Sequence, residues 1–196
     1  MLCERGRSSH IPPSDYSAAF ERVRQAECAV AASAGDQYAV PLDLGFKPSS
    51  AVTAPLLILT PHSVILAFSA WKKASEGSPH SGTAIVEFDG CCWSTFGYPN
   101  DEALEGHPLW GRGLAHYGIF DVHNSPWVRR MTEQNRVAFP NTKDDSETRH
   151  LIFSFHDNTF ECLCRGIKAA SISSEPLGEL TSSFAKICKG ILEEGV

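Results

Sequence analysis

The sequence lacks the short motifs that identify several large enzyme classes. It contains no Gly-x-x-x-x-Gly-Lys-Ser/Thr loop, no Gly-x-Gly-x-x-Gly turn, no His-Glu-x-x-His pair and no Gly-x-Ser-x-Gly elbow. These absences argue against P-loop kinases, dinucleotide-dependent dehydrogenases, zincins and α/β-hydrolases. An enzyme that needs none of these motifs stays open.

Basic residues are scarce as well. The 17 Lys and Arg residues are outnumbered by 23 Asp and Glu, which gives a formal net charge of −6. Such a chain repels nucleic-acid backbones and anionic lipid surfaces. We therefore expect a small molecule or a protein as the partner, and neither nucleic acid nor a membrane, with the oligomeric state open.

The chain also lacks long apolar runs. No stretch is long enough to cross a membrane, and no apolar segment of a secretory signal follows residues 1–7. The seven cysteines are an odd number in a chain without such a signal, which argues against a disulfide framework. We expect a cytoplasmic protein with reduced thiols.

What is present indicates a single domain over residues 1–196. Apolar side chains at helical spacing predict an amphipathic helix over 15–34 and another over 175–194, with a connecting segment over 36–55. Short apolar runs separated by turn residues indicate a sheet-rich core over 56–169. We expect an α+β fold whose largely antiparallel sheet is built from hairpins and packed with the terminal helices.

Three hairpins and a helix start are predicted within the core. The first hairpin covers 56–68, and the second covers 83–96 with its turn at Asp89-Gly90, a dipeptide that suits two-residue turns. Ser125 followed by Pro126 predicts the capped start of a helix. The third hairpin covers 149–167 and turns at Asp157-Asn158.

The third hairpin predicts one apolar and one polar face. A two-residue turn would pair Phe155 with Phe160, Phe153 with Cys162 and Leu151 with Cys164 on the core face. We interpret Cys162 and Cys164 as packed thiols rather than metal ligands. The opposite face would carry His150, Ser154, His156, Thr159, Glu161 and Arg165.

A strand over 117–123 beside this hairpin would add Asp121 and His123 to the polar face. His123, His156 and Asp121 are then candidate ligands of a divalent metal, with the cofactor otherwise unknown. The simpler interpretation, which we favour, is that an antiparallel sheet exposes one polar face to water.

The segment 97–113 is too long for an ordinary hairpin connection, and long ordered loops often carry function. Asn100 is expected to cap a short helical turn that starts with acidic residues. The candidate binding residues are Tyr98, Asn100, Asp101, Glu102, His107, Trp110 and Arg112. An equally weighted alternative is that Tyr98, Leu104 and Trp110 only plug the end of the sheet.

These observations support two main hypotheses. The first is a ligand- or partner-binding accessory protein that uses the 97–113 segment and the adjacent polar sheet face. The second is a small hydrolase, isomerase or lyase, with or without a metal, in which His107 and Glu161 are the candidate catalytic residues. A purely structural or assembly role through tryptophans is a third.

The run FGYPNDEALEGHPL at 96–109, the NSPW helix start at 124–127 and FHDNTFEC at 155–162 resemble a family of small uncharacterised bacterial proteins. The resemblance covers about residues 83–169. It implies that these segments form one module, and it implies no activity, cofactor or catalytic residue.

Overall fold

The fold is that of a computed structural model, which describes residues 13–51, 55–60, 63–72, 80–141, 147–173 and 177. Two α-helices, one 3-10 turn and ten strands make up the described chain. In chain order they are α1 (Pro13–Ala34), β1 (Tyr38–Pro41), β2 (Phe46–Pro48), β3 (Leu56–Leu59), β4 (Val64–Lys72), β5 (His80–Asp89), β6 (Trp93–Gly97), η1 (Asp101–Gly106), β7 (Ile119–His123), α2 (Pro126–Ala138), β8 (Arg149–Ser154), β9 (Thr159–Cys164) and β10 (Gly166–Ser173).

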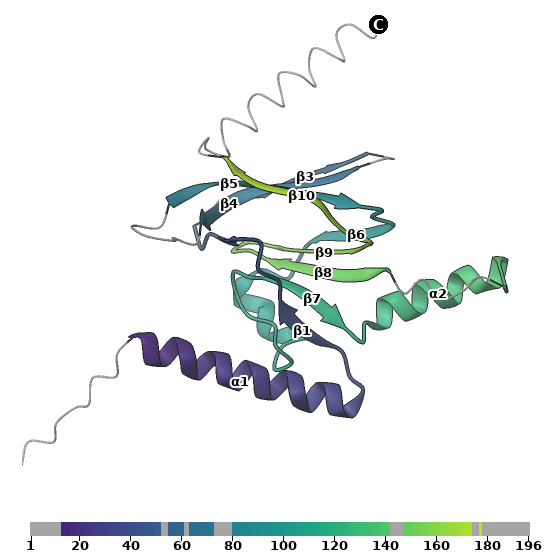
Figure 1. The fold of residues 1–196 in the computed structure, drawn as a ribbon, viewed down its shortest axis with the longest axis horizontal. Helices are drawn as coiled ribbons and strands as arrows, with labels where there is room; N and C mark the ends of the chain where they lie inside the picture. Colours follow the sequence, from purple (N-terminus) through teal and green to yellow (C-terminus); the bar gives the residue numbers. More distant parts are fainter. Residues whose placement is uncertain are drawn as a thin grey trace, which may run out of the picture.

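The strands form two stacked antiparallel sheets. One sheet has the order β1-β7-β8-β9-β6, and the other has the order β10-β5-β4-β2 with β3 also paired to β4. The main core lies between the sheets, where Phe153 packs edge-on against Phe68 and Phe88 of the facing sheet. Figure 1 shows these two layers, with α1 on the far side of the first sheet. The broad α+β expectation is confirmed, with two sheets in place of the single sheet expected.

The first predicted hairpin is confirmed, because β3 pairs with β4. The second is wrong: β5 pairs with β4 and β10, whereas β6 pairs with β9 in the other sheet. Both edges of β5 are already occupied, so β6 has no edge left to pair with. The Asp89-Gly90 turn, with Gly90 at φ +55°, instead carries the chain from one sheet to the other.

Strand order explains what covers the outer face of the first sheet. The consecutive strands β6 and β7 lie on opposite sides of the β8–β9 hairpin. The chain between them, residues 98–118, therefore has to cross the sheet, and we call it the crossover segment. Its Leu104, Leu109 and Leu114 are buried in a second apolar cluster with Phe120 and Ile152 of the sheet.

The register of β8 and β9 differs from the predicted one by two residues. Phe153 pairs with Phe160, and Ser154 and Thr159 form the last pair. The turn has four residues instead of two, closed by the Phe155 N–H donating to the Asn158 carbonyl at 2.9 Å. A shift of two keeps every side chain on its face, so the predicted apolar face of the hairpin is confirmed.

Helix α1 ends at Ala34, and Gly35 follows at φ +74°, as the sequence predicts. Its contact face differs from the expected stripe, because Phe20, Val23 and Val30 are 74%, 56% and 69% exposed. Helix α2 starts at the predicted Ser125 cap but has no buried residue. The helix expected over 175–194 lies outside the described residues except for Leu177. No described helix has the length and apolar character needed to span a membrane.

Candidate functional site

The crossover segment is built around the short turn η1. The Asn100 side chain accepts a hydrogen bond from the Ala103 N–H, and Asp101 and Glu102 occupy the first turn, as predicted. At the other end of η1, the His107 N–H donates to the Leu104 carbonyl. Because Leu104 is buried against the sheet, this turn places the His107 imidazole over β9.

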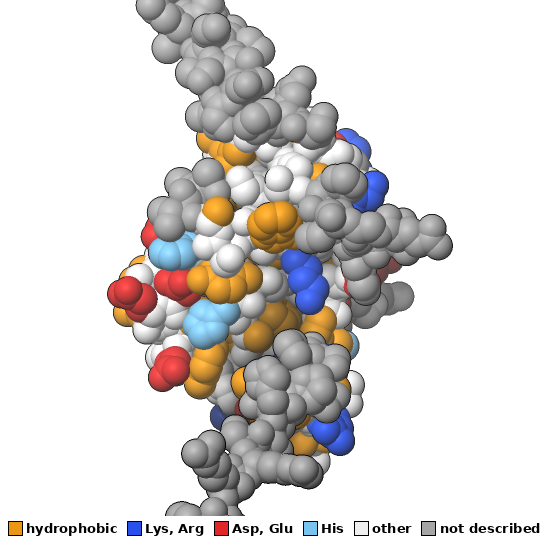
Figure 2. Space-filling model, turned by 90° about the vertical axis from the view of Figure 1, so that its left-hand side faces the viewer, with side chains coloured by type: hydrophobic (Ala, Val, Ile, Leu, Met, Phe, Trp, Pro, Cys, Tyr) orange, Lys and Arg blue, Asp and Glu red, His pale blue; other side chains and the backbone are white. Residues whose placement is uncertain are grey.

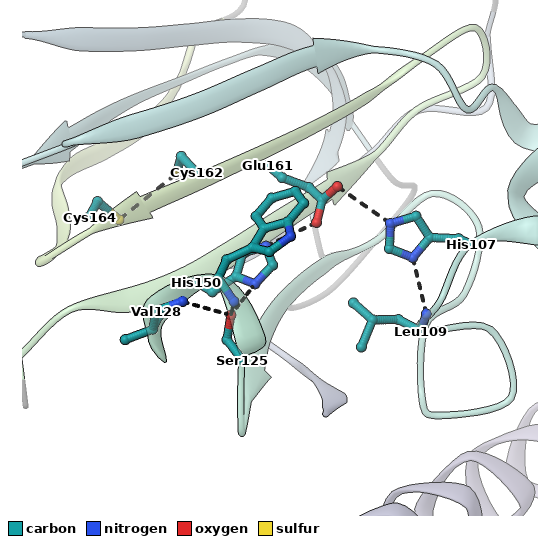
Figure 3. A network of polar contacts seen from close by, with 9 residues as sticks. His107, Leu109, Ser125, Val128, His150, Glu161, Cys162 and Cys164 are labelled. Carbon is teal, nitrogen blue, oxygen red and sulfur yellow. Dashed lines mark hydrogen bonds and ion pairs between the residues drawn. The ribbon is translucent and has the colours of Figure 1, made fainter. Parts of the chain in front are cut away.

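Four polar side chains meet beneath the crossover segment (Figure 3). Oε2 of Glu161 lies 2.9 Å from His150 Nε2, and its Oε1 lies 3.4 Å from His107 Nε2. The chain continues from His150 Nδ1 to the Ser125 hydroxyl at 2.9 Å. His107 and Glu161 meet in this network although they are 54 positions apart in the sequence. We call these four residues the buried network.

The hydrogen-bond pattern assigns the protons of this network. The Leu109 N–H donates to His107 Nδ1, so the proton of that ring is on Nε2. Ser125 Oγ accepts from the N–H groups of Trp127 and Val128, which leaves its own hydrogen for His150 Nδ1. In this arrangement Nε2 of each imidazole donates to one carboxylate oxygen of Glu161.

The surroundings of Glu161 favour its ionised form. Burial alone would raise the pKa of Glu161, but the hydrogen bonds from His107 and His150 outweigh it and hold that pKa below its ordinary value. The solvated polar face favoured from the sequence is wrong, because His150, Ser154, Thr159 and Glu161 are all buried. The crossover segment and Trp127 at the start of α2 cover what an open sheet would expose.

Ser, His and Glu are the residue types of an acyl-transfer triad, but their roles here are different. The Ser125 hydroxyl is buried and caps α2, and each ring nitrogen of the two histidines already has a partner. A buried, fully hydrogen-bonded network fixes the relative positions of the elements that supply it. The arrangement therefore holds the crossover segment and α2 on the sheet.

A second cluster anchors the start of the crossover segment. The Tyr117 hydroxyl donates to Asp101 Oδ2 at 2.5 Å, which lowers the pKa of Asp101 and raises that of Tyr117 to about 12. His156 Nε2 lies 3.8 Å from the same carboxylate. The hydrogen bond to Asp157 and the charge of Asp101 raise the pKa of His156. Asp101 thus ties both ends of the crossover segment to the β8–β9 turn.

The predicted binding residues fall into three groups. Asn100, Asp101 and His107 point inward and hold the segment, whereas Tyr98 and Glu102 are exposed. Trp110 and Arg112 are half-buried and lie toward α1. The face at the left of Figure 1 carries histidine, acidic and hydrophobic side chains close together (Figure 2).

Two adjoining hollows of about 500 and 330 Å³ lie between α1 and the crossover segment. Val23, Glu27 and Gly111 line both, so the hollows form one groove, which we call the α1 groove. The crossover segment, which forms one wall of the groove, packs tightly against β1. A Cβ on Gly113 would lie 2.2 Å from the Ala39 carbonyl oxygen. The exposed apolar side chains of α1 form its other wall.

The three residues predicted as metal ligands are not brought together. Asp121 shares the face of Leu151, toward the other sheet, and is bound by Arg149 at 2.6 Å. His123 stacks on Tyr38, and His156 lies at the β8–β9 turn. Within the described part of the chain, no three His, Cys, Asp or Glu side chains are grouped to hold a metal. The expected adjacency of this strand to the hairpin is confirmed, but the expected facing of Asp121 and His123 is wrong.

Sequence reasoning missed two members of the buried network. His150 was expected on the polar face but not among the site residues, and Ser125 was expected only as a helix cap. The strand alternation that places Glu161 and His150 on one face was visible in the sequence. Nothing local to Ser125 or His107 shows that they meet on that face.

Comparisons with models of known families, with curated proteins and with solved structures give no match to this chain. The family resemblance of residues 83–169 stays a prediction. The buried network, the crossover segment and the α1 groove are the features of this chain that bear on its function.

Proposed function

We propose that this chain is a partner-binding accessory protein that holds an amphipathic helix of another protein in the α1 groove. The observation that carries the proposal is the exposure of Phe20, Val23 and Val30 beside a groove whose second wall is the crossover segment. Apolar side chains exposed together on one helix are typical of a protein–protein contact.

The dimensions and the charge of the groove suit a helix. The stretch of α1 from Phe20 to Ala34 is about 21 Å long at ~1.5 Å per residue, which is about four helical turns. Arg112 at one end is paired with Asp36 at 3.2 Å. Glu27, in the middle, makes no ion pair with any described residue. A partner helix with Lys or Arg beside its apolar stripe would satisfy this carboxylate.

The buried network supports this proposal indirectly. It fixes the crossover segment through His107, and the Asp101 cluster fixes the start of the same segment. A wall that is rigid before binding loses little conformational freedom when the partner arrives. The polar residues of the sheet face would therefore act as positioning residues.

The contact between His107 and Glu161 also favours the alternative of an acid/base enzyme, because these two are the candidate catalytic residues of that hypothesis. A general base needs a ring nitrogen available to the substrate. Both nitrogens of His107 have partners, and its side chain is only 10% exposed. We therefore favour binding.

The test is a selection of 18-residue peptides from a random library on the full chain. We expect enriched peptides to carry apolar residues at helical spacing with Lys or Arg beside them. Val23→Asp should weaken the best peptide about tenfold or more. The matched control is Val137→Asp, at an 85% exposed position of α2, which should change its affinity less than about twofold.

Two results would contradict the proposal. One is the absence of enrichment, or peptides that bind the Val23→Asp variant as tightly as the wild type. The other is a dimer in native mass spectrometry that Val23→Asp dissociates, because the groove would then be filled by a second copy of this chain.

A further inference from the structure

A separate hollow lies between α2 and the β6 edge of the first sheet, away from the α1 groove. Its volume is about 360 Å³, and its apolar lining comes from Trp93, Trp127, Met131 and Leu163. The volume is near the lower end of the range for small-molecule sites. The hollow is therefore large enough for a small bicyclic ring system.

Its two tryptophans are held in place. The Trp93 and Trp127 rings meet edge to face with centroids 4.2 Å apart, and Trp93 stays 42% exposed. Trp127 in turn stacks on His150 at 4.7 Å, with 20° between the ring planes. Because the buried network fixes His150, it also fixes the aromatic wall of the hollow.

Polar side chains line the side of the hollow formed by α2. Arg130 and Gln134 are four residues apart on that helix, so they project from the same face. Arg130 is exposed and makes no ion pair with any described residue. A guanidinium that has no ion pair among the described residues and shares a hollow with two tryptophans is notable in a chain of net charge −6.

We propose that this hollow binds a small aromatic carboxylate. The ring system packs against Trp93 and Trp127, where apolar area and edge-to-face contacts contribute the affinity. The carboxylate accepts two parallel hydrogen bonds from Arg130, a geometry that lysine cannot supply. The Gln134 amide donates to the same group. This inference is independent of the function proposed for the α1 groove.

The residues that line the hollow favour an aromatic carboxylate over a neutral arene or a nucleotide. A neutral arene would fill the hollow but make no use of Arg130. A nucleotide would bring several negative charges to a single guanidinium in an acidic protein, where the net field opposes it. One ring system and one negative charge match the two tryptophans and the single arginine among the described residues that line the hollow.

The probe is 2-naphthoate, titrated into the full chain by isothermal calorimetry, with the uncharged 2-naphthamide as its matched ligand. We expect saturable binding of the acid with a dissociation constant below about 1 mM, and at least about tenfold weaker binding of the amide. Arg130→Gln should remove that preference. The matched control is Arg129→Gln, which deletes the same charge from the neighbouring residue outside the hollow and should change the affinity less than about twofold.

A second measurement locates the ligand without a substitution. The indole N–H signals of Trp93 and Trp127 should shift on addition of 2-naphthoate, whereas those of Trp71 and Trp110, which do not line the hollow, should stay in place. The proposal is overturned by the absence of saturable binding up to about 10 mM. Equal affinity for acid and amide, equal effects of the two arginine substitutions, or shifts confined to Trp71 and Trp110 would each overturn it as well.

Discussion

The two faces of the β8–β9 hairpin are both buried, but they are built from different chemistry. One face presents Phe153, Phe160 and Cys162 to the facing sheet. The other presents His150 and Glu161 to the crossover segment. Apolar packing on the first face stabilises the fold with little dependence on the orientation of the side chains. Hydrogen bonds on the second face form only when donor and acceptor lie at the right distance and angle. The first face thus supplies most of the stability, and the second determines where the crossover segment lies.

The largest effect is expected from breaking the apolar face. Phe153→Ala removes a fully buried ring that contacts Phe68 and Phe88, and the cavity should cost about 4 kcal/mol of unfolding free energy. Urea unfolding followed by circular dichroism measures this loss. A loss no larger than that of the Glu161 variant described next would contradict the assignment of stability to this face.

A smaller effect is expected from the polar face. Glu161→Gln keeps one oxygen acceptor but places an NH2 group against an imidazole N–H, so one buried donor loses its partner. The expected loss is about 2 kcal/mol. The His107 and His150 ring signals in NMR spectra should shift in this variant, since both rings contact the carboxylate. Unchanged ring signals would show that the network is not formed.

The pH dependence of the unfolding free energy tests the contribution of the polar face. The pKa of Glu161 in the folded chain lies below its ordinary value of 4.5, so its contribution is present above that pH and is lost as the pH falls through the folded value. The stability difference between wild type and Glu161→Gln should therefore shrink as the pH falls below 4.5. Comparing the two chains removes the contribution of Asp101, whose pKa is also lowered. A stability difference that stays constant down to low pH would contradict an ionised Glu161 in the folded chain.

The smallest loss of unfolding free energy is expected from a substitution at the edge of the apolar face. Asp121 and Arg149 form an ion pair at 2.6 Å, but their side chains are 22% and 35% exposed. Solvent weakens such a pair, so Asp121→Asn should cost less than about 1 kcal/mol. Urea unfolding of this variant measures the cost. A cost comparable to that of Glu161→Gln would mean that this pair, too, is part of the buried scaffold.

The sequence predicted those parts of the fold that depend on neighbours along the chain. Strand alternation identified the apolar face of the β8–β9 hairpin, and the Ser125-Pro126 pair identified the start of α2. The Asp89-Gly90 turn predicts a hairpin, and this prediction is wrong because β5 is already paired with β4 and β10 on its two edges. The residues of the turn itself carry no information about those partners.

The candidate site was predicted less completely, for a related reason. His107 and Glu161 were both predicted as catalytic candidates but not as a contact, and the structure joins them across 54 positions. The burial of the polar face depends on the crossover segment lying over it, which follows from the order of β6 and β7 in the sheet. Strand order is a property of the whole chain, and no local pattern reveals it.

That strand order also has a consequence for synthesis on the ribosome. The crossover segment emerges first, while the β8–β9 hairpin on which it lies is made later, so His107 precedes its partner Glu161 by 54 residues. Leu104, Leu109 and Leu114 consequently have no sheet to pack against until the hairpin has been translated. A nascent chain that ends before β9 carries this apolar segment uncovered, which makes it a natural binding site for chaperones during translation.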